Sequence, residues 1–138
     1  MRRTLPAVVA AAALALSACG GGDSPSDEQK IRTAVREYFS AFSEGDGAKA
    51  CAYLTTETRA RIVEAAKTDD CADAMKAAAE RPDVKPYVER FRDVEVLDVK
   101  IAGAEASAKV RAIGQETTVP LEKEEDDWKL TVADAPDG

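Results

Sequence analysis

The spacing of apolar residues changes once along this chain, from a helical period to a strand period near residue 94. Before that point apolar residues recur three and four positions apart, which is typical of amphipathic helices. Beyond it they alternate with polar residues, which is typical of strands with one buried face. This order predicts an α+β fold, with N-terminal helices packed on one face of a curved antiparallel sheet of about four strands.

Residues that cap helices divide the helical half. Ser26 followed three residues later by Gln29 fits a capping box, and Gly45 lies where a left-handed C-cap would end that first helix. The Arg81–Pro82 pair ends the last full helix, and residues 86–91 are expected to form one further turn. Three more helices are expected between these limits, each after a residue able to cap it: Asp46, Thr55 or Thr56, and Asp69 or Asp70.

Four alternating segments follow, separated by turn residues. In the first segment the apolar residues change from even to odd positions between Val96 and Leu97. Such a change indicates a β-bulge. The second, residues 104–112, has alanine at most of its inward positions. Small side chains there either leave room for a ligand or let a helix pack closely, and the pattern favours neither. The third segment includes residues 117–121, and the fourth begins at Trp128.

Trp128 is the only tryptophan of the chain, and it shares strand parity with Leu130 and Val132. The first helix presents an apolar stripe that includes Val35 and Phe39. A single domain of this length buries these two surfaces against each other. We therefore predict that Trp128 lies largely buried between sheet and helices, with its indole N–H meeting a polar partner or facing a cavity.

The N-terminus has the order of parts found in a secreted bacterial precursor. Two arginines precede an apolar run over residues 5–16, whose helical rise of roughly 18 Å is too short to cross a hydrocarbon core of about 30 Å. Residues 16–19 read Leu-Ser-Ala-Cys and resemble the lipobox cut by lipoprotein signal peptidase. We expect residues 1–18 to be a lipoprotein signal peptide and Cys19 to carry a diacylglyceryl group. The alternative is an ordinary secretory signal in which Cys19 is incidental.

The expected lipid anchor predicts where the protein is located and how the chain divides into segments. One acyl chain holds a protein only marginally, whereas two give stable attachment. The protein is therefore expected at the extracytoplasmic face of the cell membrane, or in the periplasm. Residues 19–27 are interpreted as the lipidated cysteine and a Gly-rich linker, residues 28–133 as a single α+β domain, and residues 134–138 as a tail.

Charge and composition exclude several functions. Loss of Arg2 and Arg3 with the signal peptide lowers the formal net charge from −7 to −9, which excludes a general nucleic-acid binder and argues against docking on anionic lipid. Histidine is absent, so the most common general base and metal ligand is missing. The acidic run over residues 122–127 lacks calcium-loop spacing and is interpreted as a solvated turn rather than a cation site. We expect no metal and no cofactor.

The cysteine count predicts one disulfide. The chain has three cysteines, and lipidation of Cys19 leaves Cys51 and Cys71 as a pair. An oxidising compartment permits the bridge, which would close a loop of about 20 residues and stabilise the fold by about 3 kcal/mol in the chain-entropy model. The alternative is two buried free thiols, which pack as small apolar side chains.

Three segments carry a family resemblance. They are residues 39–46 at the end of the first helix, residues 48–54 in the second, and the closing strands over residues 119–122 and 128–130. In these segments the chain resembles the nuclear transport factor 2-like (NTF2-like) superfamily, also called the SnoaL-like or cystatin-like α+β cone. Small secreted lipoproteins of high-GC Gram-positive bacteria look similar, including a cysteine in the second helix and another some twenty residues on. The likeness covers roughly residues 28–133.

The resemblance implies a cone-shaped cavity between the sheet and the helices. Two functional classes follow from it. One is a non-catalytic module that binds a small apolar ligand or a protein partner at the cell envelope, and the other is an isomerase, cyclase or dehydratase working in the cavity. The absence of histidine, and of an aspartate placed in the cone as a base, favours the first. The candidate lining residues, which plain core packing explains equally well, are Tyr38, Phe42, Tyr53, Met75 and Trp128.

Intact-mass analysis of protein extracted from membranes tests the anchor. We expect loss of residues 1–18 and a gain of diacylglyceryl mass on Cys19. The Cys19→Ala variant should be released or should persist as an uncleaved precursor, because the acyl chains hold the mature protein. A processed Cys19→Ala protein that stays on the membrane would contradict the lipobox interpretation.

Overall fold

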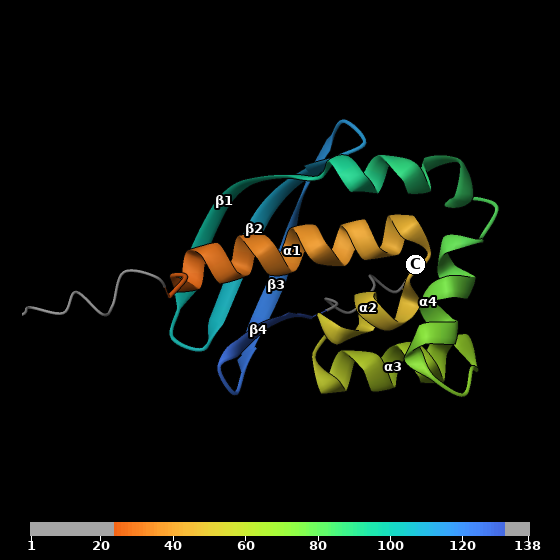
Figure 1. Ribbon diagram of the computed structural model, residues 1–138, viewed down its shortest axis with the longest axis horizontal. Coiled ribbons are helices and arrows are strands. Elements are labelled where there is room, and N and C mark those ends of the chain that lie inside the picture. The colour runs from red at the N-terminus through yellow and green to blue at the C-terminus, as the bar shows by residue number, and fades with distance from the viewer. Residues whose placement is uncertain (1–23, 132–138) are drawn as a thin grey trace, which may run out of the picture.

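The computed structural model describes residues 24–131. The predicted signal peptide, Cys19 and residues 132–138 lie outside the described residues. Within them, five helical segments precede a four-stranded antiparallel sheet that is not closed. The predicted α+β class and the order of its two halves are therefore confirmed. Figure 1 shows α1 crossing one face of the sheet, with α2, α3 and α4 grouped beyond the C-terminal half of α1.

Side-chain caps define the starts of the four α-helices, as the sequence predicts. The Ser26 hydroxyl accepts from the Gln29 N–H at 3.2 Å, and the Gln29 side chain accepts from the Ser26 N–H at 2.9 Å. Of the paired candidates further along, Thr55 and Asp70 are the N-caps. The helical segments are α1 (Asp27–Glu44), α2 (Gly47–Ala52), α3 (Thr56–Ala66), α4 (Cys71–Ala79) and the 3₁₀ helix η1 (Lys85–Asp93).

The sheet is a meander in which each strand pairs with the next along the chain. Its register shifts between Val96 and Asp98, which confirms the predicted bulge at Leu97. The turn after the second strand has Ile113 and Gly114 in left-handed backbone conformations, which suits a two-residue hairpin. The strands are β1 (Glu95–Ala102), β2 (Glu105–Ala112), β3 (Gln115–Glu124) and β4 (Asp127–Leu130).

The core lies between α1 and the inner face of the sheet. Ile31 and Val35 of α1 are fully buried, as are Ala108 and Val110 of β2. Each large apolar side chain buried in this way contributes about 1.5–3 kcal/mol relative to exposure. Because Ala108 projects only a methyl group, the inner face accommodates the helix closely at the middle of β2. At this position the alanine strand serves packing rather than an open cavity.

Trp128 joins the two layers. It is 3% exposed, and Leu130, which shares its face, is equally buried. The indole N–H donates to a carboxylate oxygen of Asp27, the first residue of α1, at 3.0 Å. This confirms the predicted burial of Trp128 and supplies the polar partner that was expected. Val132, the third residue of the predicted set, lies outside the described residues.

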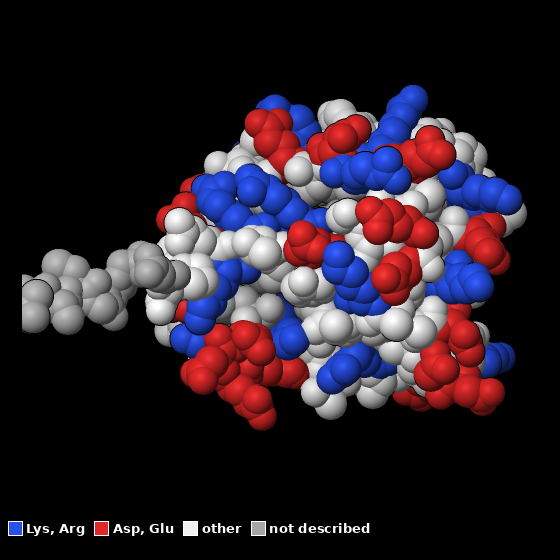
Figure 2. Space-filling view, in the orientation of Figure 1, with Lys and Arg blue, Asp and Glu red and all other residues white. Residues whose placement is uncertain are grey.

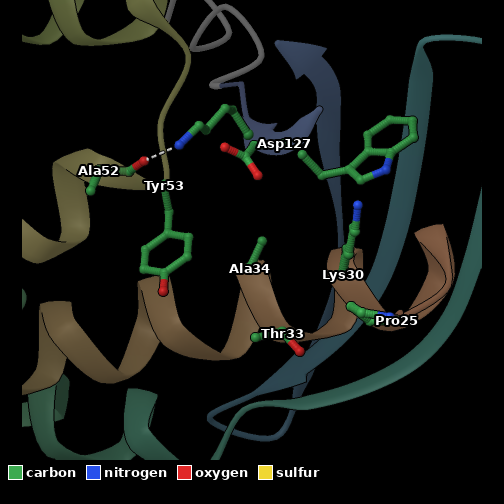
Figure 3. A pocket seen from close by; sticks show the side chains of 9 residues that line it. Pro25, Lys30, Thr33, Ala34, Ala52, Tyr53 and Asp127 are labelled. Carbon is green, nitrogen blue, oxygen red and sulfur yellow. Dashed lines mark hydrogen bonds between the residues drawn. The ribbon is translucent and has the colours of Figure 1, made fainter. Parts of the chain in front are cut away.

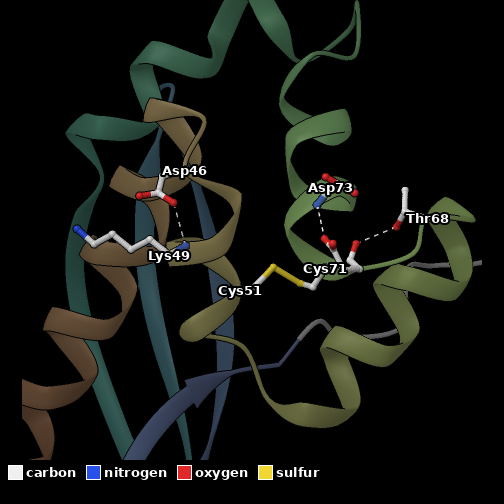
Figure 4. The surroundings of a disulfide bond; sticks show 7 residues. Asp46, Lys49, Cys51, Thr68, Cys71 and Asp73 are labelled. Carbon is white, nitrogen blue, oxygen red and sulfur yellow. Dashed lines mark hydrogen bonds between the residues drawn. A yellow bond between two sulfur atoms is a disulfide. The ribbon is translucent and has the colours of Figure 1, made fainter.

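A disulfide joins Cys51 of α2 to Cys71 at the start of α4 (Figure 4), as predicted. The two Cα atoms are 6.1 Å apart and 20 positions apart in the sequence. The two helices also approach each other at Gly47, where an added Cβ would overlap the carbonyl oxygen of Ala72. The second helix therefore needs glycine at its first position to lie this close to α4.

Five helical segments lie between residues 24 and 131. None of them combines the length and the apolar character that crossing a bilayer requires.

Replacing both Cys51 and Cys71 with alanine should lower the free energy of unfolding by about 2–4 kcal/mol, because the open loop gains entropy when the chain unfolds. Urea unfolding of the variant and of the oxidised parent measures this difference. Reduction of the parent serves as the control and should reproduce most of the loss. Free, alkylatable thiols at both positions in the mature protein would contradict the bridge.

Candidate functional site

The five candidate lining residues fall into two environments. Tyr53 and Trp128 line one hollow beside the start of α1. Met75 is buried in the core, and Tyr38 and Phe42 pack against that core. The side chains that the resemblance grouped together are therefore divided between a surface depression and the interior.

A second depression is lined by three aromatic residues, Phe39, Tyr87 and Phe91. It has a volume of about 570 Å³ and lies between α1 and η1 on one side and the β2–β3 hairpin on the other. In Figure 1 the tip of that hairpin projects behind η1. We call this depression the apolar groove, and its lining residues are Phe39, Tyr87, Phe91, Val110, Ala112, Ile113, Gln115, Glu116 and Thr117.

Contacts between aromatic rings form the helical wall of the groove. The rings of Phe39 and Phe91 stack with centroids 5.8 Å apart, and Phe42 meets Phe91 edge-on at 5.6 Å. Such pairs contribute about 0.5–1.5 kcal/mol each beyond their buried area. They attach η1 to α1, while Tyr87 remains 45% exposed at the rim. The wall therefore combines a fixed stack of rings with an accessible aromatic edge.

Short side chains form the sheet wall. Val110 and Ala112 lie on the inner face of β2, and Thr117 lies opposite Val110 on β3. Ala112 lies beyond the segment that α1 covers and is only partly buried. Ala108, four residues earlier on the same face, is fully buried. The sequence left open whether the alanines of β2 let a helix pack closely or leave room for a ligand. The centre of the strand packs closely against α1, and its end borders free space.

Ion pairs hold the one charged residue that borders the groove. Glu116 is the only charged residue among the lining residues named above. Its carboxylate meets the Arg111 guanidinium at 2.7 Å and the Lys109 ammonium at 3.2 Å. The hydrogen bond from Arg111 is the main cause that holds the pKa of Glu116 below its usual value. Because Glu116 pairs in register with Arg111, its carboxylate shares the outer face of the sheet with these cations, opposite to Val110 and Thr117. The side chains that face the groove are therefore uncharged.

The sequence interpretation missed Tyr87 and Phe91. Both lie in the segment for which only a single turn was expected, and η1 extends beyond it to Asp93. The available signal was their spacing, since residues four apart share one face of a helical turn. That spacing marks them as a pair, but it does not show that they meet Phe39 of α1.

The hollow that Tyr53 and Trp128 line has a volume of about 480 Å³. We call it the tether-side hollow, because Pro25 beside it belongs to the predicted linker. It lies between α1, the end of α2 and the start of β4, next to Pro25. Figure 3 shows Lys30, Thr33 and Ala34 along α1 facing Tyr53 and Asp127 across this space. Its full lining is Pro25, Lys30, Thr33, Ala34, Ala52, Tyr53, Asp127, Trp128 and Lys129.

Two titratable side chains of the helical layer have raised pKa values. Desolvation raises the pKa of Tyr38 to about 12, so its phenol stays protonated and neutral at physiological pH. The ammonium of Lys49 lies 2.8 Å from a carboxylate oxygen of Glu37, and their hydrogen bond raises the pKa of Lys49. Among residues 24–131, no three cysteine or acidic residues gather closely enough to hold a metal ion.

Comparison with known proteins assigns no family to the chain. No family model, curated protein or solved structure matches it. The candidate sites therefore rest on the geometry of this chain alone.

The bond between Asp27 and Trp128 predicts a dependence of stability on pH. That hydrogen bond, followed by the Lys123 ammonium 3.5 Å away, holds the pKa of Asp27 below its ordinary value of 3.8. A lowered pKa stabilises the fold at pH values above the unfolded-state value, and this contribution is lost as the pH falls through the folded-state pKa.

Asp27→Asn should therefore unfold at lower urea concentration than the parent at pH 7, with the difference shrinking in acid. Urea unfolding followed by Trp128 emission at several pH values measures this. Asp126→Asn, a change of an exposed acid in the β3–β4 turn, is the matched control. A gap between Asp27→Asn and parent that stays constant down to pH 2 would contradict the assignment.

Proposed function

We propose that this chain is a lipid-anchored extracytoplasmic protein whose NTF2-like domain binds a small apolar molecule without converting it. The apolar groove is the observation that carries the proposal. Its volume of about 570 Å³ falls in the range of about 300–1,000 Å³ typical of small-molecule sites. Aromatic rings line one side of it and small side chains the other, an arrangement suited to an apolar ligand.

The NTF2-like architecture is part of the proposal. Support comes from the order of elements, from α1 lying across a four-stranded antiparallel meander, and from a depression where the sheet extends beyond that helix. A cone of this kind places a ligand between the inner face of the sheet and the helices. The groove occupies that position, because Val110 and Phe39 belong to its opposite walls.

The charge state of the groove favours binding over catalysis. A cone-cavity enzyme needs an acid or base that faces the reacting molecule. Glu116 is the one acidic residue that borders the groove, and its carboxylate pairs with Lys109 and Arg111 on the outer face of the sheet, away from Val110. An uncharged, apolar ligand matches such a lining, since no buried ionic group of the ligand would need a partner.

The proposed anchor keeps this groove near the membrane. Residues 19–24 span at most about 18 Å when fully extended, so the domain stays beside the bilayer to which Cys19 would be attached. Apolar molecules concentrate in and around bilayers. A tethered domain with an apolar groove is therefore well placed to bind them at the cell envelope.

Ala112→Leu tests the groove directly. The larger side chain fills space between the sheet and the rings, so binding of the neutral dye Nile red should weaken at least about tenfold while the circular dichroism spectrum stays unchanged. The matched control is Ala60→Leu on the exposed face of α3, which should bind as the parent does. Equal binding by Ala112→Leu and the parent would contradict the proposal.

A second variant separates binding from catalysis. Glu116→Gln should retain Nile red affinity within about twofold, because the proposed contacts are apolar. Native mass spectrometry of membrane-extracted protein should detect a retained ligand of unchanged mass. Conversion of that ligand by the parent, with loss of conversion in Glu116→Gln, would favour the cone-cavity enzyme instead.

A further inference from the structure

The tether-side hollow differs from the groove in its charge. Two ammonium groups line it, those of Lys30 and Lys129, against the single carboxylate of Asp127. Figure 3 shows the Asp127 carboxylate between the two sides of the hollow. The lining therefore carries a positive excess of one charge, in a chain whose formal net charge is −7.

Backbone carbonyl oxygens hold both ammonium groups in place. The Lys129 ammonium donates to the carbonyl of Ala52 at 2.6 Å, at the end of α2. The Lys30 ammonium donates to the carbonyl of Asp126 at 3.5 Å. A carbonyl positions an ammonium without cancelling its charge. Within the described residues, neither lysine has a carboxylate oxygen within ion-pair distance, in contrast to Lys49 with Glu37. Lys30 still acts electrostatically on the Asp27 carboxylate that is bonded to Trp128.

Acidic side chains lie beside the hollow on one side. Figure 2 shows acidic and basic side chains interspersed over the face that α1 crosses, with acidic side chains gathered over the β3–β4 turn at the lower left. That turn holds Glu124, Glu125 and Asp126. An anion would be repelled at the turn and held between the two lysines, so its position in the hollow would be well defined.

We propose that the tether-side hollow binds a monoanionic amphiphile, namely a carboxylate carried on an apolar chain or ring. Its carboxylate would lie between the ammonium groups of Lys30 and Lys129. Its apolar part would lie on the floor formed by Ala34, Tyr53 and Trp128. A single negative charge matches the lining's excess of one positive charge, because Asp127 offsets one of the two ammonium charges.

Trp128 provides a signal confined to this site. It is the only tryptophan of the chain, and its ring lines the hollow. The apolar groove is lined by phenylalanine and tyrosine instead. A change in tryptophan emission therefore reports on the tether-side hollow, and this site is tested independently of the groove.

The test is a titration of Trp128 emission in the purified protein with three probes. Octanoate should change the emission saturably. Octanamide, which has the same chain without the charge, should bind at least about fivefold more weakly, because its contacts with both ammonium groups lose their ionic character. Acetate, which has the charge without the chain, should leave the emission unchanged at the same concentration.

Variants identify the residues responsible. Lys30→Gln and Lys129→Gln should each weaken octanoate binding about fivefold, and Lys100→Gln, an exposed lysine on β1, should not. Equal affinity for octanoate and octanamide would overturn the proposal, as would parent-like binding by a variant carrying both lysine changes. Loss of the octanoate response in Ala112→Leu would also overturn it, because the signal would then come from the groove.

Discussion

Burial of α1 against the inner face of the sheet is the interaction on which the rest of the structure depends. Ile31 and Val35 lose all exposure there, and Ala108 makes room for them. Because α1 covers only part of the sheet, inward-facing residues beyond it stay accessible. Both depressions border this helix, since Phe39 contributes to the groove and Ala34 to the tether-side hollow.

The two depressions differ in charge because the ionic side chains around them have different partners. At the groove, Glu116 pairs with Lys109 and Arg111 on the outer face of the sheet, so the side chains that face the groove beside Val110 are uncharged. At the hollow, Lys30 and Lys129 meet carbonyl oxygens, so their charges remain available. One small domain therefore presents an apolar surface and a cationic one, and the proposed ligands differ accordingly.

The disulfide contributes to the hollow although it lies in the helical part. It ties α2 to α4, and the chain leaving α2 then runs beside β4. There the Leu130 N–H donates to the carbonyl of Tyr53 at 2.7 Å, and the Thr55 N–H donates to the carbonyl of Leu130 at 3.0 Å. These bonds cover an edge of the sheet and fix Tyr53 as one wall of the hollow. An edge paired in this way is also protected from pairing with another chain.

The sequence by itself determined the features that depend on near neighbours. Ser26 and Gln29 form the cap because they are three positions apart, the bulge at Leu97 follows from a slip of parity, and Cys51 pairs with Cys71 as expected from the count. It also indicated that Trp128 would be buried with a polar partner.

Only the tertiary structure decided that this partner is Asp27, 101 positions away, and that Phe91 meets Phe39 to form a groove. The physical reason is that periodicity gives the inward face of an element but not how far its neighbours extend over that face. Ala108 and Ala112 point to the same side of β2, yet α1 covers the first completely and leaves the second accessible.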